Sequence, residues 1–179
     1  MQEFFKNLSE KTAAFATTRN TLILFALWLV FQVVLAKAGG AIQAESGGAS
    51  VLDLALAYTP DAAYANYLDK YSEVARSIYL KTECLDLLYP LCYGLFFACL
   101  LTAAWRGTNY LYLNVVPLIA IVFDYLENIG VFALLLSYPT HLPFMAAWAS
   151  GFGTIKWALA AASLLCLVVG FGKKIIRRF

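Results

Sequence analysis

The chain has 179 residues and a formal net charge of only +2, with 62% hydrophobic and 13% charged residues. A typical soluble domain carries roughly a quarter charged residues, and a soluble chain of this length could not bury so much apolar surface. The composition therefore excludes an ordinary soluble domain. We expect one membrane domain over residues 1–179, with the lipid bilayer and not a nucleic acid as its surroundings.

Apolar residues gather in four long blocks, which predict membrane-spanning helices at about 21–38, 82–105, 111–137 and 144–171. A helix needs about 20 mainly apolar residues to cross the hydrocarbon core. The last three blocks reach this length, and the first can be prolonged because Lys37 can extend its side chain to the interface. The predicted fold is therefore all-α, an integral membrane four-helix bundle with up-down topology.

The first block has a second interpretation as a signal peptide. Ala36, Lys37 and Ala38 follow a charged start and an apolar run, as at an A-x-A cleavage site. The leader before this run carries Glu3 and Glu10, however, and is longer than a short basic n-region. We therefore favour an uncleaved helix, whereas cleavage would leave three helices and an external amino terminus.

The segment between the first two blocks has a mixed character. Residues 39–50 are small and polar, which is typical of a flexible linker. Thr59 and Pro60 then predict a helix start, with Thr as N-cap and Pro at the first helical position. The apolar residues that follow share one helical face: Tyr64, Tyr67, Leu68 and Tyr71.

Ser72 predicts a second N-cap in the same segment. Residues 59–80 should therefore form two short amphipathic helices in the first extracytoplasmic loop. Two arrangements are open for them: they lie on the lipid interface, which is the simpler interpretation, or they cover the bundle as a lid.

Basic residues are distributed unevenly along the chain. Eight of them fall on one side if the chain crosses the membrane four times: Lys6, Lys11, Arg19, Arg106, Lys173, Lys174, Arg177 and Arg178. Short cytoplasmic segments collect Lys and Arg. We therefore expect a multi-pass protein of the plasma membrane (the inner membrane of a bacterium), with both termini cytoplasmic and residues 39–80 outside.

Five ionisable residues lie within or at the ends of the apolar blocks: Glu83, Asp86, Asp124, Glu127 and Lys156. Such residues are costly in hydrocarbon, usually face the bundle interior, and are candidates for a functional site. At a rise of about 1.5 Å per residue, Asp124 and Lys156 share a level near the midplane of two antiparallel helices. We therefore expect Lys156 to lie within reach of Asp124 or Glu127.

Neighbouring polar residues extend this cluster. Asn128 follows Asp124 at i+4 and lies on the same helix face. Pro90 frees a backbone carbonyl one turn earlier and predicts a kink beside Asp86, with Tyr93 on the same face. Gln32, in the outer half of the first block, can complete the polar track.

Together these residues predict a cavity that opens outward and is floored by Lys156 and Asp124. Four acids around one amine cannot all ionise in a medium of low dielectric constant, so at least one must be protonated or meet a cation. The alternative interpretation is a structural ion pair between Lys156 and Asp124 that fixes the helix register.

No pattern typical of catalysis accompanies the cluster. Cys84, Cys92, Cys99 and Cys166 form no C-x-x-C motif, and His141 has no neighbouring ligand pattern. A nucleophile–base pair and a phosphate-binding loop are also missing. The sequence therefore favours a protein without enzymatic activity, metal or cofactor.

Four stretches carry a resemblance to a bacterial family of four-helix membrane proteins: 58–71 with Y-T-P, 79–94 with Y-P and Y-G, 123–128 with F-D-Y-L-E-N, and 156–157. This resemblance implies the fold but no activity. The chain is more faintly similar to the emopamil-binding and sigma-2-receptor-like superfamily, which implies an intramembrane pocket for cationic amphiphiles or for sterol isomerisation. The third block departs from that pattern, so no catalytic residue is carried over.

The leading functional hypothesis is binding of an amphiphilic or lipid-like small molecule in an intramembrane polar cavity. One alternative is an accessory subunit of a larger membrane complex, which would bind a membrane protein partner. The buried charges would then only hold the helices of this chain together. Proton-coupled transport is less favoured because the sequence shows no inverted repeat, and a lipid-processing enzyme is favoured least.

Overall fold

The computed structural model describes residues 2–176, and all regular structure within them is helical. The α-helices follow in chain order: α1 (Gln2–Phe15), α2 (Thr18–Glu45), α3 (Pro60–Asn66), α4 (Glu73–Asp86), α5 (Tyr89–Trp105), α6 (Val116–Ser137) and α7 (Pro143–Ile176). Three short 3₁₀ helices lie between them: η1 (Leu52–Leu54), η2 (Leu68–Lys70) and η3 (Leu111–Val115). The predicted all-α class is confirmed, while Arg177 and Arg178 of the basic side lie outside the described residues.

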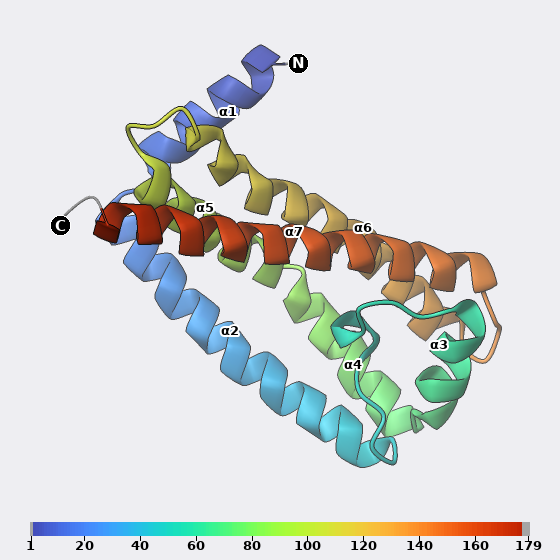
Figure 1. The fold of residues 1–179 in the computed structure, drawn as a ribbon. Helices are drawn as coiled ribbons and strands as arrows, with labels where there is room; N and C mark the ends of the chain where they lie inside the picture. The colour runs from blue at the N-terminus through green and yellow to red at the C-terminus, as the bar shows by residue number, and fades with distance from the viewer. Residues whose placement is uncertain (1, 177–179) are drawn as a thin grey trace.

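Three stretches are each long and apolar enough to cross a membrane: α2, η3 together with α6, and α7. Helices α4 and α5 pass the same test only as a pair, bent by 41° at the break between them. The break directly precedes Pro90, which cannot donate a helical hydrogen bond, so the predicted kink is present. Figure 1 shows the long helices side by side, with both termini at one end and α3 at the other.

Helix α1 was not predicted from the sequence, which has no apolar block there. It lies against the inner ends of α5 and η3. The side-chain amide of Asn114 donates to the Ser9 carbonyl at 3.0 Å, and the Arg106 guanidinium donates to the Ala13 carbonyl at 2.7 Å. Because Asn114 is buried, this contact fixes α1 beside the bundle.

The predicted linker over residues 39–50 is wrong in its first half, because α2 continues through Gly39 and Gly40 to Glu45. Each glycine disfavours a helix by about 1 kcal/mol relative to alanine. Ile42 offsets this cost, since it is fully buried in the outer core beside Ala75 and Tyr79.

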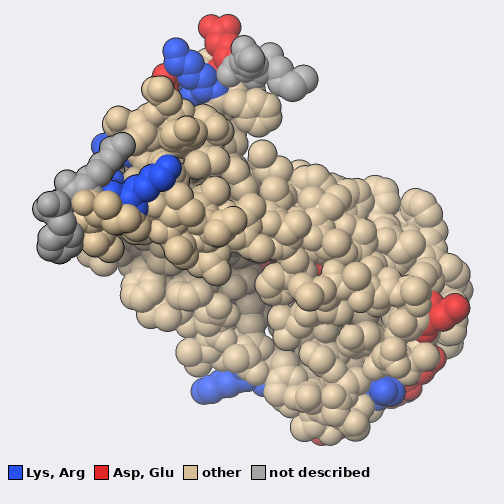
Figure 2. Space-filling model, in the orientation of Figure 1, with Lys and Arg blue, Asp and Glu red and all other residues tan. Residues whose placement is uncertain are grey.

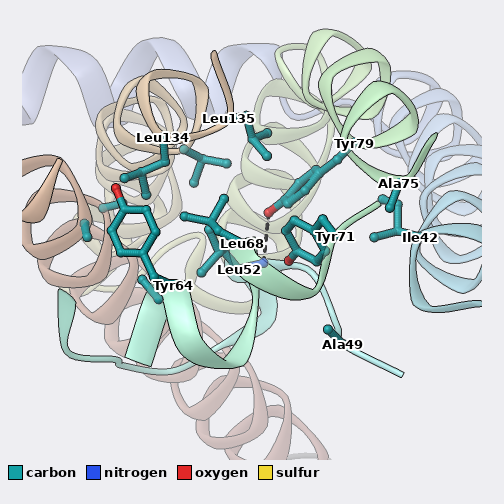
Figure 3. Packing of buried hydrophobic residues seen from close by; sticks show 14 residues of the cluster. Ile42, Ala49, Leu52, Tyr64, Leu68, Tyr71, Ala75, Tyr79, Leu134 and Leu135 are labelled. Carbon is teal, nitrogen blue, oxygen red and sulfur yellow. Dashed lines mark hydrogen bonds between the residues drawn. The ribbon is translucent and has the colours of Figure 1, made fainter. Parts of the chain in front are cut away.

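The segment over residues 59–80 packs its buried side chains against the bundle, as expected of the lid arrangement. Thr59 and Ser72 accept hydrogen bonds from backbone amides at 3.2 and 3.0 Å, as expected of N-caps. The first of the two predicted helices, whose apolar face would extend to Tyr71, is interrupted at Tyr67, which has φ −129° and ψ −77°. Figure 3 shows the buried side chains of this cap facing residues of α6: Tyr64, Leu68, Tyr71 and Tyr79, with Leu134 and Leu135.

Helices α6 and α7 form the closest pair. A Cβ added at Gly130 would lie 2.8 Å from the Ala149 Cβ, and one added at Gly153 would collide with the Glu127 carboxyl group. Small residues let two helix backbones approach closely. This proximity places Glu127 of α6 directly against α7.

Candidate functional site

A cavity of about 910 Å³ lies between α2 on one side and α5, α6 and α7 on the other. Residues 50–58, which we call the outer strap, pass across its outer end and contribute Val51, Asp53 and Leu56 to the lining. Ligand pockets typically measure 300–1,000 Å³. Figure 2 shows a hollow in a face that is almost entirely tan, with only small red areas visible inside it, while the larger groups of Lys, Arg, Asp and Glu lie at the edges of the view.

The two ends of the cavity differ in polarity. The inner end is lined by apolar and aromatic side chains: Trp28, Phe97, Pro117, Ala120, Ala161 and Leu164. The outer end carries most of the polar groups of the lining, Gln43, Ser50, Asp53, Tyr79, Thr82 and Asp86, together with the apolar Val51, Leu54 and Leu56. Asp124 and Lys156 lie between the two ends, and Ser163 is a polar residue nearer the inner end. The lining is thus mainly apolar, with its polar groups concentrated in the outer half.

Lys156 and Glu127 form a buried ion pair, and the Lys156 Nζ lies 3.9 Å from Asp124 Oδ2. The expected proximity of Lys156 to both acids is therefore observed. Glu127 is fully buried, and Lys156 is 9% exposed. Because Glu127 does not line the cavity, the ammonium group is held toward the protein side by its closest partner.

The two aspartates of the cavity have different partners. Asp124 Oδ2 accepts a hydrogen bond from the Tyr93 hydroxyl at 2.8 Å, while Asp124 Oδ1 is buried without a hydrogen-bond partner among the described residues. Asp86 Oδ2 accepts from the Asn128 side-chain amide at 2.9 Å. Both carboxylates therefore join α4–α5 to α6 and still retain acceptor capacity.

Glu83 does not reach the cavity. It is fully buried, and within residues 2–176 neither of its carboxylate oxygens meets a hydrogen-bond donor. An isolated buried carboxylate is strongly disfavoured in its charged form.

The outer strap supplies one lining residue that the sequence prediction missed, Asp53, and its last residue, Tyr58, is partly buried behind the lining. The Tyr79 hydroxyl donates to Asp53 Oδ1 at 2.6 Å and accepts from the Leu52 amide at 2.9 Å. Burial, followed by the charge of Glu127, raises the pKa of Tyr58 well above its ordinary value. The Tyr58 hydroxyl is therefore a neutral group beside the acids. Neither residue lies in an apolar block, so no hydropathy signal marked them.

The remaining predicted residues are divided between the cavity and its support. Gln32 and Tyr93 line the cavity with Asp86, Asp124 and Lys156. The others lie behind the lining: Glu83, Pro90, Glu127 and Asn128. The cavity also differs in two ways from the prediction. Helix α2 forms one of its walls, and Lys156 and Asp124 lie midway along it, with apolar residues beyond them, instead of forming its floor.

The chemistry that this arrangement supports is recognition by hydrogen bonds and charge. Within residues 2–176, no group of three or more His, Cys, Asp or Glu side chains could hold a metal ion. Comparison with protein-family models, curated proteins and solved structures gave no match to the chain.

Proposed function

We propose that the protein crosses the plasma membrane four times, through α2, the bent pair α4–α5, α6 and α7, and binds an amphiphilic or lipid-like small molecule in its cavity. Both termini are cytoplasmic in this proposal. The observation that carries it is a mainly apolar cavity whose carboxylates, Asp53, Asp86 and Asp124, lie in its outer half and middle, while aromatic and aliphatic side chains predominate at the inner end. An amphiphile has the same division along its length.

The distribution of charge supports the orientation. Six basic residues of the described chain lie at the end that holds α1, namely Lys6, Lys11, Arg19, Arg106, Lys173 and Lys174, whereas the opposite end carries four, Lys37, Lys70, Arg76 and Lys81. Cytoplasmic segments near membrane helices collect Lys and Arg, while acids have little influence. The polar end of the cavity then faces the extracytoplasmic side, where a head group meets water.

The experiment compares two adjacent alanines of α7. Ala161 lines the cavity, and Ala162 is exposed outside the lining. The protein is purified from membranes in mild detergent, and bound small molecules are identified by native mass spectrometry and lipid extraction. We expect a discrete amphiphile on the wild-type protein and on Ala162→Trp, and its loss from Ala161→Trp, because the added indole fills the cavity.

Retention of the same molecule by both variants would place it on the outer surface and contradict the proposal. Purification of a wild-type protein that carries no discrete small molecule but a stable second membrane protein would favour the accessory-subunit function. Thermal unfolding of both variants shows whether the tryptophans are tolerated equally.

A further inference from the structure

The wall of the cavity that faces the bilayer lies between α2 and α7. Helix α2 packs on α4 and α5, and α7 packs on α6, α5 and α3. Only 6% of the residues in the α2 membrane window are buried, against 50% in the η3–α6 window. Where α2 and α7 border the cavity, small residues stand among larger ones: Ala36, Gly39 and Gly40 beside Gln32 and Leu35 on α2, and Ala160 and Ala161 beside Trp157 and Leu164 on α7.

The space beside these small residues is open. A Cβ added at Gly39 or Gly40 would meet no atom within 4 Å. They therefore differ from Gly130 of α6 and Gly153 of α7, where atoms of the neighbouring helix fill the space. A side opening toward the acyl chains of the bilayer is the geometric result.

The outer end of the cavity, by contrast, is covered by the outer strap. The Tyr58 amide donates to Ser150 Oγ at 2.9 Å, and Thr154 Oγ1 donates to the Leu56 carbonyl at 2.8 Å. The Tyr71 hydroxyl donates to the Ser50 carbonyl at 2.6 Å. These bonds attach both ends of the strap to the protein, so a molecule reaches the cavity more readily from the lipid than from the water.

The lining offers more hydrogen-bond acceptors than donors. Three carboxylates line the cavity, those of Asp53, Asp86 and Asp124, and the ammonium group of Lys156 is paired with Glu127. Among the described residues, no donor reaches Asp86 Oδ1 or the buried Asp124 Oδ1. A buried acceptor left without a donor is costly, so a head group that donates hydrogen bonds is favoured over one that only carries positive charge.

We propose that the ligand is a membrane-resident amphiphile with a hydrogen-bond-donating head group, an ammonium or a hydroxyl, which enters from the bilayer between α2 and α7. Its head group lies against Asp86 and Asp124, and its chain points toward Phe97 and Leu164. This inference rests on the proposed function and adds the ligand class and the route of entry.

The probes are three amphiphiles that share a brominated alkyl chain and differ in head group: a primary amine, a glycerol monoether and a trimethylammonium. Bromine quenches the fluorescence of nearby tryptophans, and Trp28 and Trp157 line the cavity. The protein is placed in nanodiscs of ordinary phosphatidylcholine, and saturable quenching is measured. The amine and the glycerol ether should bind about tenfold or more tightly than the trimethylammonium, the difference expected of hydrogen bonds to charged acceptors.

Comparison of the amine with the glycerol ether shows whether the head group must be charged, and the Asp86→Asn variant shows whether Asp86 accepts its hydrogen bond. Tight binding of the amine alone assigns an ammonium ligand, and equal binding of the amine and the glycerol ether assigns hydrogen-bond donation without charge. Asp86→Asn should remove most of the advantage over trimethylammonium. Equal affinity of all three head groups for the wild-type protein would overturn the ligand class.

The route is tested by the rate of quenching. Gly40→Phe places a ring in the side opening without a clash, and Val33→Phe is the matched control on the lipid-facing side of α2. Gly40→Phe should slow the onset of quenching about tenfold or more, while Val33→Phe leaves it unchanged. An unchanged rate in Gly40→Phe with intact saturable binding would overturn the route alone. Absence of saturable quenching by every probe would overturn the proposed function as well.

Discussion

Helix α2 and the α6–α7 pair are both apolar and long enough to cross a membrane, yet they are built differently. Gly130 of α6 and Gly153 of α7 face the neighbouring helix, and a Cβ at Gly130 would lie 2.8 Å from the Ala149 Cβ. In α2 the glycines at 39 and 40 face open space. The comparison suggests that the α6–α7 pair is the rigid support of the polar cluster, whereas α2 is a loosely packed wall of the cavity.

The largest effect is expected where the α6–α7 pair buries charge. Lys156→Met removes the partner of a fully buried Glu127. Breaking a buried ion pair by removing one member costs about 3–5 kcal/mol. The free energy of unfolding, measured by denaturant titration in detergent micelles, should fall by that amount.

The double variant Lys156→Met with Glu127→Gln is the control for this prediction. Because neutral replacement of both partners is often tolerated, it should recover much of the lost stability. If the single variant is as stable as the wild type, Lys156 is not required by a buried acid and the description of the α6–α7 pair is wrong.

A direct comparison of the two regions uses the same substitution in each. Gly130→Ala forces α6 away from α7 and should destabilise the protein by about 1–3 kcal/mol, as overpacking does. Gly40→Ala meets no neighbouring atom and should stabilise α2 by up to about 1 kcal/mol through helix propensity. The melting temperatures of both variants are measured in the same detergent. Shifts of the same sign would show that α2 and the α6–α7 pair do not differ in packing at these glycines.

The Tyr79 hydroxyl makes two of the hydrogen bonds that hold the outer strap, one with the Leu52 amide and one with Asp53. Tyr79→Phe leaves the amide of the fully buried Leu52 without its acceptor, which costs about 1–3 kcal/mol. The loss should be local, so hydrogen exchange should accelerate in residues 50–58 and remain slow in α6 and α7. Tyr112→Phe, at an exposed tyrosine, is the control. Faster exchange spread evenly over the bundle would show that the strap and the support are one cooperative unit.

A smaller effect is expected at the start of α3. Thr59→Ala removes the hydroxyl that accepts from the Ala62 amide at 3.2 Å, and loss of an N-cap costs about 1 kcal/mol. Thr59→Ser keeps the acceptor and should behave like the wild type. Equal stability of the alanine and serine variants in thermal unfolding would mean that the capping bond contributes nothing measurable.

The sequence predicts the features that depend on neighbouring residues or on position along a helix. The apolar blocks predict the long helices, Thr59 and Ser72 predict the N-caps of α3 and α4, and depth in the membrane predicts that Lys156 lies within reach of Asp124 or Glu127. Position along two antiparallel helices is enough for this contact, because the rise per residue is fixed.

The missed features depend on contacts between distant parts of the chain. Asp53 becomes a site residue only because Tyr79 and α7 hold the outer strap over the cavity. Helix α2 extends through two glycines because Ile42 is buried against residues of α4. Helix α1 is fixed by Asn114, more than a hundred residues away. No periodicity or composition reports such pairings.

The central claim is that an amphiphile occupies the space between the loosely packed α2 and the rigid α6–α7 pair, and photo-crosslinking tests it most directly. A diazirine-bearing alkyl glycerol ether is activated in nanodiscs at low ratio to protein, and the modified peptides are mapped by mass spectrometry. We expect adducts in residues 36–43 of α2 and 157–164 of α7, and excess unlabelled ether should suppress them. Adducts confined to lipid-facing residues such as Val33 and Val168, unaffected by the competitor, would contradict it.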